Sequence, residues 1–143
     1  MERLSIFSNG ISDISPLDNL KKLEEVYLCG NHISDVSPLS ELHHLEKLIM
    51  RGNRVKDISP LSELNRLKVL NLCKDVEEAG GVLNEEYPLN DLSPALELEN
   101  LEELSITLNQ LDITEGSATR EIIQELKEKN VDVEYELQEL RLE

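Results

Sequence analysis

Apolar and polar residues alternate along short segments that recur at a fixed spacing. In residues 23–29, Val26 and Leu28 alternate with Glu25, Tyr27 and Cys29, which is the period of a β-strand with one buried face. The same alternation returns in residues 45–51, 22 residues further along the chain. Equivalent segments at constant spacing predict parallel strands stacked in register, the architecture of a solenoid.

A second repeated phrase separates these strands. Ile-Ser-Asp-Ile-Ser-Pro-Leu occupies residues 11–17, close copies occupy 33–39 and 55–61, and a looser copy occupies 89–95. Serine followed by proline predicts an N-cap with proline in the first helical position. We therefore expect a short helical turn on the outer side of each coil.

Three further sets of residues recur with the repeat, and we predict a structural role for each. Leucines after the turn should point back into the core, asparagines should bond turn backbone inside the coil, and aspartates should cap backbone amides rather than bind calcium or act in catalysis. These sets are Leu20, Leu42 and Leu64; Asn9, Asn31 and Asn53; and Asp13, Asp35, Asp57 and Asp91.

These motifs identify a leucine-rich repeat. The 22-residue form resembles bacterial internalin-type repeats and related phosphatase-regulatory proteins over about residues 3–109. The resemblance implies one α/β domain across residues 1–143, with a parallel concave sheet, short helical turns on the convex side and a binding role for proteins. Because this repeat class serves many unrelated partners, it does not identify the partner.

The repeat spacing is interrupted once. Asp57 and Asp91 are 34 residues apart rather than 22, so 12 extra residues lie near 76–88. This segment contains four glutamates, Gly80-Gly81 and Tyr87. We expect a loop at one edge of the solenoid, either a binding loop or a tolerated insertion, since added loop length costs little free energy.

The two ends of the chain differ in pattern. Residues 117–129 predict an amphipathic helix with Ala118, Ile122, Ile123 and Leu126 on one face, and Asn130 is a plausible terminator. Alternation in residues 131–135 adds a last strand, so residues 114–136 should form a C-terminal cap. Residues 1–3 lead directly into the first strand, which predicts a bare strand edge that invites self-association, or truncation of a longer array.

Charge is distributed unevenly along the chain. Residues 1–74 contain ten acidic and ten basic side chains, whereas residues 75–143 contain twenty acidic and four basic ones, which accounts for the whole net charge of −16. The acidic half should repel nucleic acid and anionic membranes and favour a basic partner. Alternatively, the acidity serves solubility alone.

The inner sheet surface is the candidate binding site. Its solvent-facing positions combine apolar, aromatic and basic side chains, which is typical of protein interfaces; the alternative is scattered apolar residues without a role. Tyr27 and Arg51 are the expected anchors. The candidate partner-binding residues are Phe7, Tyr27, Cys29, Lys47, Ile49, Arg51, Val69, Asn71 and Cys73 on the sheet, with Tyr87 on the inserted loop.

No residue pattern in the sequence favours catalysis, a cofactor or a metal. Cys29 and Cys73 are predicted two strands apart, about 9–10 Å, too far for a disulfide, and free thiols fit a reducing compartment. His43 and His44 have no third ligand at a suitable spacing. Gly80-Gly81 lacks the Lys-Ser/Thr of a phosphate loop.

Two functions remain open: a protein-interaction module, or a structural, self-associating scaffold or part of a longer array. We do not expect an enzyme. No membrane-spanning or secretory segment is apparent. We therefore expect a soluble cytoplasmic protein, unless the chain was processed from a secreted or surface precursor.

Overall fold

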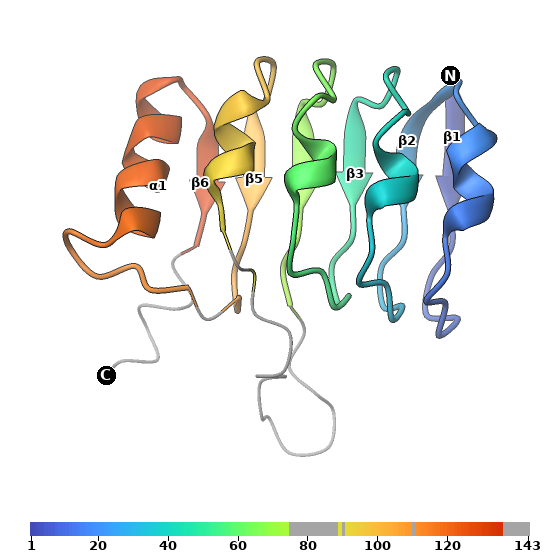
Figure 1. The fold of residues 1–143 in the computed structure, drawn as a ribbon, viewed down its shortest axis with the longest axis horizontal. Coiled ribbons are helices and arrows are strands. Elements are labelled where there is room, and N and C mark those ends of the chain that lie inside the picture. Colours follow the sequence, from blue (N-terminus) through green and yellow to red (C-terminus); the bar gives the residue numbers. More distant parts are fainter. Residues whose placement is uncertain (75–88, 90, 110, 136–143) are drawn as a thin grey trace.

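The strands form one parallel sheet in which neighbours in the sequence are neighbours in space (Figure 1). The computed structural model describes residues 1–74, 89, 91–109 and 111–135. The sheet order is β1-β2-β3-β4-β5-β6. The strands are β1 (Glu2–Ser5), β2 (Leu23–Tyr27), β3 (Lys47–Ile49), β4 (Val69–Asn71), β5 (Glu103–Ser105) and β6 (Asp132–Glu134).

The register of the strands follows the sequence repeat. Val26 pairs with Leu48 and Leu48 with Leu70, each 22 residues further on. Leu70 then pairs with Leu104, so the sheet keeps its register across the 34-residue spacing. Residues 76–88, where we placed the acidic loop, lie outside the described residues.

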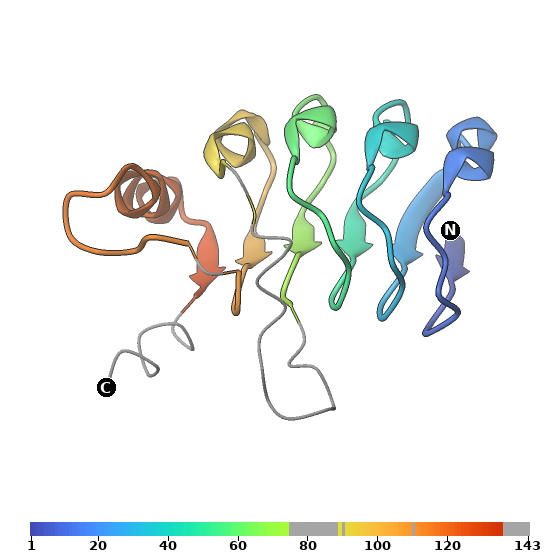
Figure 2. The ribbon, with the colours of Figure 1, turned by 60° about the horizontal axis from the view of Figure 1, so that its bottom comes forward.

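Short 3-10 turns connect the strands on one side of the sheet (Figure 2). They are η1 (Ser15–Asn19), η2 (Ser37–Leu39), η3 (Ser59–Leu61) and η4 (Ser93–Glu97). The predicted serine N-cap is wrong, because each turn starts at the serine itself and the N-cap position belongs to the apolar residue before it, Ile14, Val36, Ile58 or Leu92. The backbone N–H of the serine is therefore the first in the turn that has no hydrogen-bond acceptor within the turn itself.

The aspartates supply that acceptor, as predicted. Asp13 Oδ1 accepts a hydrogen bond from the Ser15 amide at 2.9 Å. The other three copies of the phrase make the same bond at the same length. The repeated aspartate therefore starts each turn, and its recurrence reflects this structural role.

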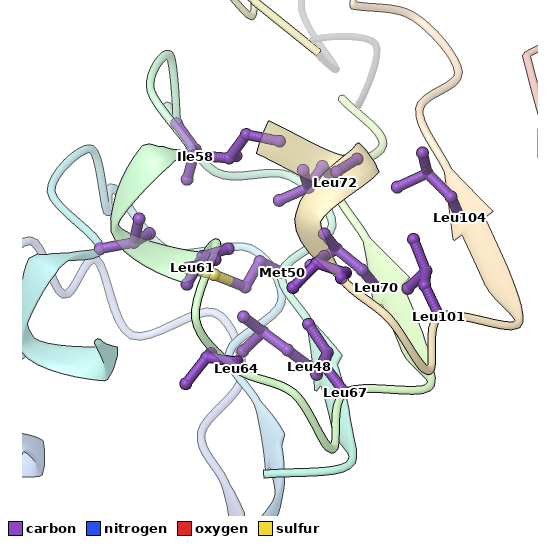
Figure 3. Close-up of a cluster of buried hydrophobic side chains, with 14 of the residues drawn as sticks. Leu48, Met50, Ile58, Leu61, Leu64, Leu67, Leu70, Leu72, Leu101 and Leu104 are labelled. Atoms are coloured by element: carbon purple, nitrogen blue, oxygen red, sulfur yellow. The ribbon is translucent and has the colours of Figure 1, made fainter. Parts of the chain in front are cut away.

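Leucine, isoleucine and valine fill the space between the sheet and the turns. Leu48 and Leu70 from the strands face Leu61 and Leu64 from the turn segment (Figure 3). We predicted that the leucine after each turn points into the core. This is confirmed for Leu42 and Leu64, which are fully buried, and wrong for Leu20, which is 44% exposed. Leu20 belongs to the end coil, which has a neighbouring coil on one side only among the described residues.

Buried asparagines satisfy the polar backbone inside the coils. Asn53 Nδ2 donates to the carbonyls of Leu28 at 2.7 Å and Met50 at 3.0 Å, and its Oδ1 accepts from the Ile33 amide at 3.0 Å. Asn31 is buried in the equivalent position, whereas Asn9 is exposed. The predicted role is thus confirmed where two coils enclose the amide.

A helix and a strand follow the last repeat. Helix α1 (Ala118–Glu128) is N-capped by Ser117, whose side chain accepts a hydrogen bond from the Arg120 amide. Ile123 and Leu126 are buried, while Ala118, expected on the same face, is exposed. Asn130 has φ +66 after the helix, as suits a terminator. Strand β6 then pairs with β5, so α1 and β6 extend the core and the sheet together (Figure 1).

At the opposite end, β1 pairs with β2 and, among the described strands, with no other. The exposed large hydrophobic residues of the described chain, Met1, Phe7 and Leu20, all lie in this first coil. No helix of the described residues is long and apolar enough to cross a membrane.

Candidate protein-binding face

One face of the sheet carries no helical turn (Figure 2). We call it the open face, and it consists of the strand side chains that point away from the core, together with Phe7, Cys29 and Arg51, which follow the strands. Strand pairing aligns these side chains in rows, as predicted. One row is Arg3, Glu25, Lys47, Val69, Glu103 and Asp132; the next is Ser5, Tyr27, Ile49, Asn71, Ser105 and Glu134.

Strand β6 adds Asp132 and Glu134 to the open face, and our sequence prediction of this face omitted both. Both residues are exposed, and Asp132 is in register with Glu103. The signal was present, because Val131, Val133 and Tyr135 alternate with them and are buried. The sequence did not specify that this strand would join the same sheet.

The candidate binding residues differ in how far they reach solvent. Phe7 is 51% exposed, and Arg51 is also exposed. Cys73, by contrast, is buried, so its thiol offers little surface to a partner. Tyr87 lies outside the described residues. The half-buried candidates are Tyr27, Cys29, Lys47, Ile49, Val69 and Asn71.

Tyr27 is held by its neighbours on the open face. Its hydroxyl donates to Glu25 Oε2 at 3.0 Å, and the Arg3 guanidinium lies 4.4 Å from its ring centroid. Arg3 Nε is also 3.9 Å from Glu25 Oε2. These contacts fix the ring and place a cation beside the Glu25 carboxylate, so the β1–β2 end of the open face is electrically balanced.

The β5–β6 end of the open face has a different charge balance. Glu103 and Asp132 are adjacent in register, and within the described chain neither has an ion-pair partner. Glu134 Oε2 accepts a hydrogen bond from Ser105 Oγ at 3.2 Å, which leaves its negative charge in place. Like charges at neighbouring strand positions repel, so this acidic end is uncompensated.

Asn71 and the two cysteines bond mainly to nearby backbone. Asn71 Oδ1 accepts from the Cys73 amide at 3.0 Å. Cys29 Sγ lies 3.9 Å from the Ile49 carbonyl oxygen. Neither cysteine forms a disulfide bond.

Lys74 is a buried cation that the sequence analysis missed. Its Nζ donates to the Asn53 carbonyl at 3.1 Å and the Val55 carbonyl at 2.9 Å. In the preceding coils the acceptor equivalent to Val55 takes a backbone amide, from His32 or Arg54. Burial lowers the pKa of Lys74 to about 8. The Lys74 ammonium thus donates to the Val55 carbonyl, whose equivalents in the preceding coils accept a hydrogen bond from a backbone amide.

Several titratable residues outside the open face make local contacts. The bonds from Ser37 and Ser93 lower the pKa of Asp35 and Asp91, because they stabilise the carboxylate. His43 Nε2 lies 3.3 Å from Glu41 Oε2, while His44 Nδ1 contacts Arg66. Within the described residues no three His, Cys, Asp or Glu side chains are placed to hold a metal.

Among the described residues, two of the cavities lie between helical segments on the side of the sheet opposite the open face. One, of about 380 Å³, is lined by residues of η4 and α1, including Leu96, Leu126 and Lys129. The other, of about 310 Å³, lies between η3 and η4. Lys129 Nζ donates to the Leu96 carbonyl across the first cavity at 3.3 Å, which ties α1 to the last repeat.

Comparison with known proteins agrees with this architecture. Residues 1–41 match the family described as leucine-rich repeats in two copies. The chain is similar to an internalin (inlF) from Listeria monocytogenes, with 29% identity and a TM-score of 0.69 over 86% of this chain and 31% of that one. It is also similar to an internalin C2 (inlC2) from the same organism, with 30% identity and a TM-score of 0.65 over 82% and 48% of the respective chains.

The chain thus spans less than half the length of either internalin. Among curated proteins, none matches its sequence at a significant level. The parallel sheet, the repeated turns and the matched family make this a leucine-rich repeat protein. Its repeats are of the internalin-like type. Proteins of this class commonly bind other proteins on an extended surface.

Proposed function

We propose that this protein is an interaction module that binds a partner protein on its open face and acts by binding rather than by catalysis. The observation that carries the proposal is the half-exposed Phe7 together with Tyr27, Ile49 and Val69 at solvent-facing positions. Apolar and aromatic side chains beside charged ones are characteristic of interface centres. The acidic second half of the chain favours a basic partner.

Affinity capture from lysate of the source organism tests this proposal, with bound proteins quantified by mass spectrometry. The variant Tyr27→Ala/Arg51→Ala removes a ring and an arginine from the open face, and we expect the specific partner signal to fall about tenfold or more. The matched control, His43→Ala/Arg66→Ala, removes an exposed ring and an arginine from a segment outside that face and should retain the partner. Equal retention by both variants would exclude the open face.

We also propose self-association through the first coil as a second function. The outer edge of β1 is unpaired within the described chain, and the exposed Met1, Phe7 and Leu20 belong to the same first coil. Residues 1–22 contain three acidic and three basic side chains, so two first coils can meet without net repulsion. Such a head-to-head pair would keep the acidic halves apart.

Sedimentation velocity of the whole chain measures this association directly. We expect a concentration-dependent dimer that is lost in Leu20→Glu and retained in the control Gln124→Glu, which adds the same charge at an exposed position of α1. A monomer at all concentrations up to about 100 μM would overturn the second proposal without affecting the first.

A cytoplasmic location is a further proposal. Cys29 and Cys73 form no disulfide bond, and cysteines without disulfides are typical of reducing compartments. Immunodetection in fractionated cells of the source organism tests it, and recovery in the medium or at the cell surface would contradict it.

A further inference from the structure

The open face has two zones of different chemistry. The apolar zone consists of Tyr27, Ile49 and Val69 on the adjacent strands β2, β3 and β4. The acidic zone consists of Glu103, Asp132 and Glu134 on β5 and β6. A partner that covers both zones must therefore present an apolar surface to one and cationic groups to the other.

The acidic zone differs from the other acidic side chain in these rows, Glu25, whose charge already has partners within the protein. Glu25 accepts the Tyr27 hydroxyl at 3.0 Å and lies 3.9 Å from Arg3 Nε. Glu103 and Asp132 are exposed neighbours with no cation of the described chain paired to them. A lysine or arginine from outside the chain would relieve their mutual repulsion.

The two zones adjoin, because Val69 is in register with Glu103 on the next strand. The strand spacing gives the distance from the centre of the apolar zone to the far side of the acidic zone. Ile49 on β3 and Glu134 on β6 belong to the same row and are separated by three strand spacings, which is about 14 Å. An extended polypeptide covers about 3.3–3.6 Å per residue. About four residues of an extended segment that crosses the strands therefore span from the centre of the apolar zone to the β6 carboxylates of the acidic zone.

We propose that the open face binds an extended polypeptide segment in one orientation, with an apolar side chain against Tyr27, Ile49 and Val69 and a lysine or arginine about four positions away against Glu103, Asp132 and Glu134. This inference rests on the proposed function and adds the chemistry and polarity of the bound segment. The apolar contact supplies affinity, and the charge contact sets the direction.

A phage-displayed library of random 12-residue peptides is the probe for this proposal. Selection on the unaltered protein should enrich an apolar residue followed or preceded, about four positions away, by lysine or arginine. Selection on Glu103→Lys/Asp132→Lys should enrich acidic residues at that position instead. The control Glu63→Lys/Glu97→Lys makes the same change in net charge at exposed positions of the helical-turn side and should enrich the original motif.

Affinities of a selected synthetic peptide give the quantitative test. At about 50 mM salt, the Glu103→Lys/Asp132→Lys variant should bind it at least about tenfold more weakly, and the difference should shrink at about 500 mM salt because ions screen exposed charges. A photoreactive group beside the basic residue of the peptide should label β5 or β6. Labelling of β1 or β2, or equal affinity for the variant and the unaltered protein, would overturn the proposed orientation.

The variant Ile49→Asp separates failure of this inference from failure of the proposed function, with Ile49→Thr as a second variant that keeps a β-branched side chain. Circular dichroism checks the fold of each. If Ile49 variants abolish peptide binding while charge reversal has no effect, the open face binds protein but the charge inference is wrong. If no selected peptide depends on Ile49 while partner capture still depends on Tyr27 and Arg51, the inference fails and the proposed function stands; if neither depends on the open face, both fail.

Discussion

The two ends of the solenoid bury their apolar residues to different extents. At the β1 end, Met1, Phe7 and Leu20 are exposed, and Leu20 is the repeat leucine whose equivalents Leu42 and Leu64 are fully buried. At the other end, α1 and β6 bury Ile123 and Leu126 against the last repeat. The same repeat leucine is therefore part of the core in one coil and part of the surface in another.

This difference shows that burial in a solenoid depends on the neighbouring coil. Each coil contacts only the units before and after it, so an end coil keeps one uncovered flank unless another element is supplied. The element supplied after β5 is a helix with its own amphipathic pattern, capped by Ser117. Comparing substitutions at the two ends measures this effect.

The largest expected difference is between leucines at the two ends. Leu126→Ala removes a buried side chain and leaves a cavity between α1 and the last repeat, so the free energy of unfolding should fall by roughly 2–5 kcal/mol. Leu20→Ala should cost less than about 1 kcal/mol, because the side chain is already 44% exposed. Urea unfolding followed by circular dichroism measures both, and equal losses would contradict the comparison.

Replacing an asparagine in the end coil and one in the interior should also have different effects on the free energy of unfolding. Asn53→Ala leaves the Leu28 and Met50 carbonyls and the Ile33 amide without their partner, so it should lower the free energy of unfolding by roughly 2–3 kcal/mol. Asn9 is exposed and donates to Phe7 O at 2.7 Å, where water can replace it. Asn9→Ala should therefore change that free energy by no more than about 0.5 kcal/mol in the same urea titration.

The next largest difference in stability is expected between serines at the start of two helical segments. Ser117→Ala removes the side-chain oxygen that accepts from the Arg120 amide and should cost about 1 kcal/mol. Ser15→Ala keeps the backbone bond to Asp13 and removes only the side-chain hydrogen bond to the same exposed carboxylate, so it should change the free energy of unfolding by no more than about 0.5 kcal/mol. Thermal unfolding of both variants against the unaltered protein tests this, and a larger loss at Ser15 than at Ser117 would contradict the predicted difference.

The smallest expected effect is a pH dependence that the two ends share. Hydrogen bonds from Ser15 lower the pKa of Asp13, and hydrogen bonds from Thr114 lower the pKa of Asp112. Each carboxylate therefore stabilises the fold above its unfolded pKa of about 3.9, and this contribution is lost as pH falls through the lower pKa of the folded state.

Asparagine at either position keeps an acceptor oxygen but does not titrate. Asp13→Asn and Asp112→Asn should each reduce the slope of unfolding free energy against pH below about pH 4, with little change in slope at neutral pH. Urea titrations at several pH values between about 2.5 and 7 provide the measurement. An unchanged acid slope in both variants would show that these bonds do not stabilise the charged form.

Much of the fold was predictable because it is encoded locally and then repeated. Alternation around Val26 and Leu28 identified the inward face of β2, and the 22-residue spacing placed β3 and β4 in register with it. The amphipathic pattern of residues 117–129 gave α1 to within one residue at each end. Repetition made these predictions reliable, since one coil repeats the geometry of the next.

The sequence predicted the rows of side chains at the candidate site but not all of the residues in them. The rows through Tyr27 and Ile49 are as expected from the repeat. Asp132 and Glu134 were missed because their segment has a different sequence, and its pairing with β5 is a contact between distant parts of the chain. The acidic zone exists because of that pairing.

The sequence by itself determined the coil: its strand, its Asp-capped turn, its inward leucines and the surplus of acidic residues after position 74. The tertiary structure decided which of these residues are covered. Burial of Cys73 and Lys74, exposure of Leu20 and the meeting of Glu103 with Asp132 all depend on what lies beside a coil. The physical reason is that side-chain direction follows the local backbone, whereas burial and charge balance depend on neighbours that the chain supplies from elsewhere.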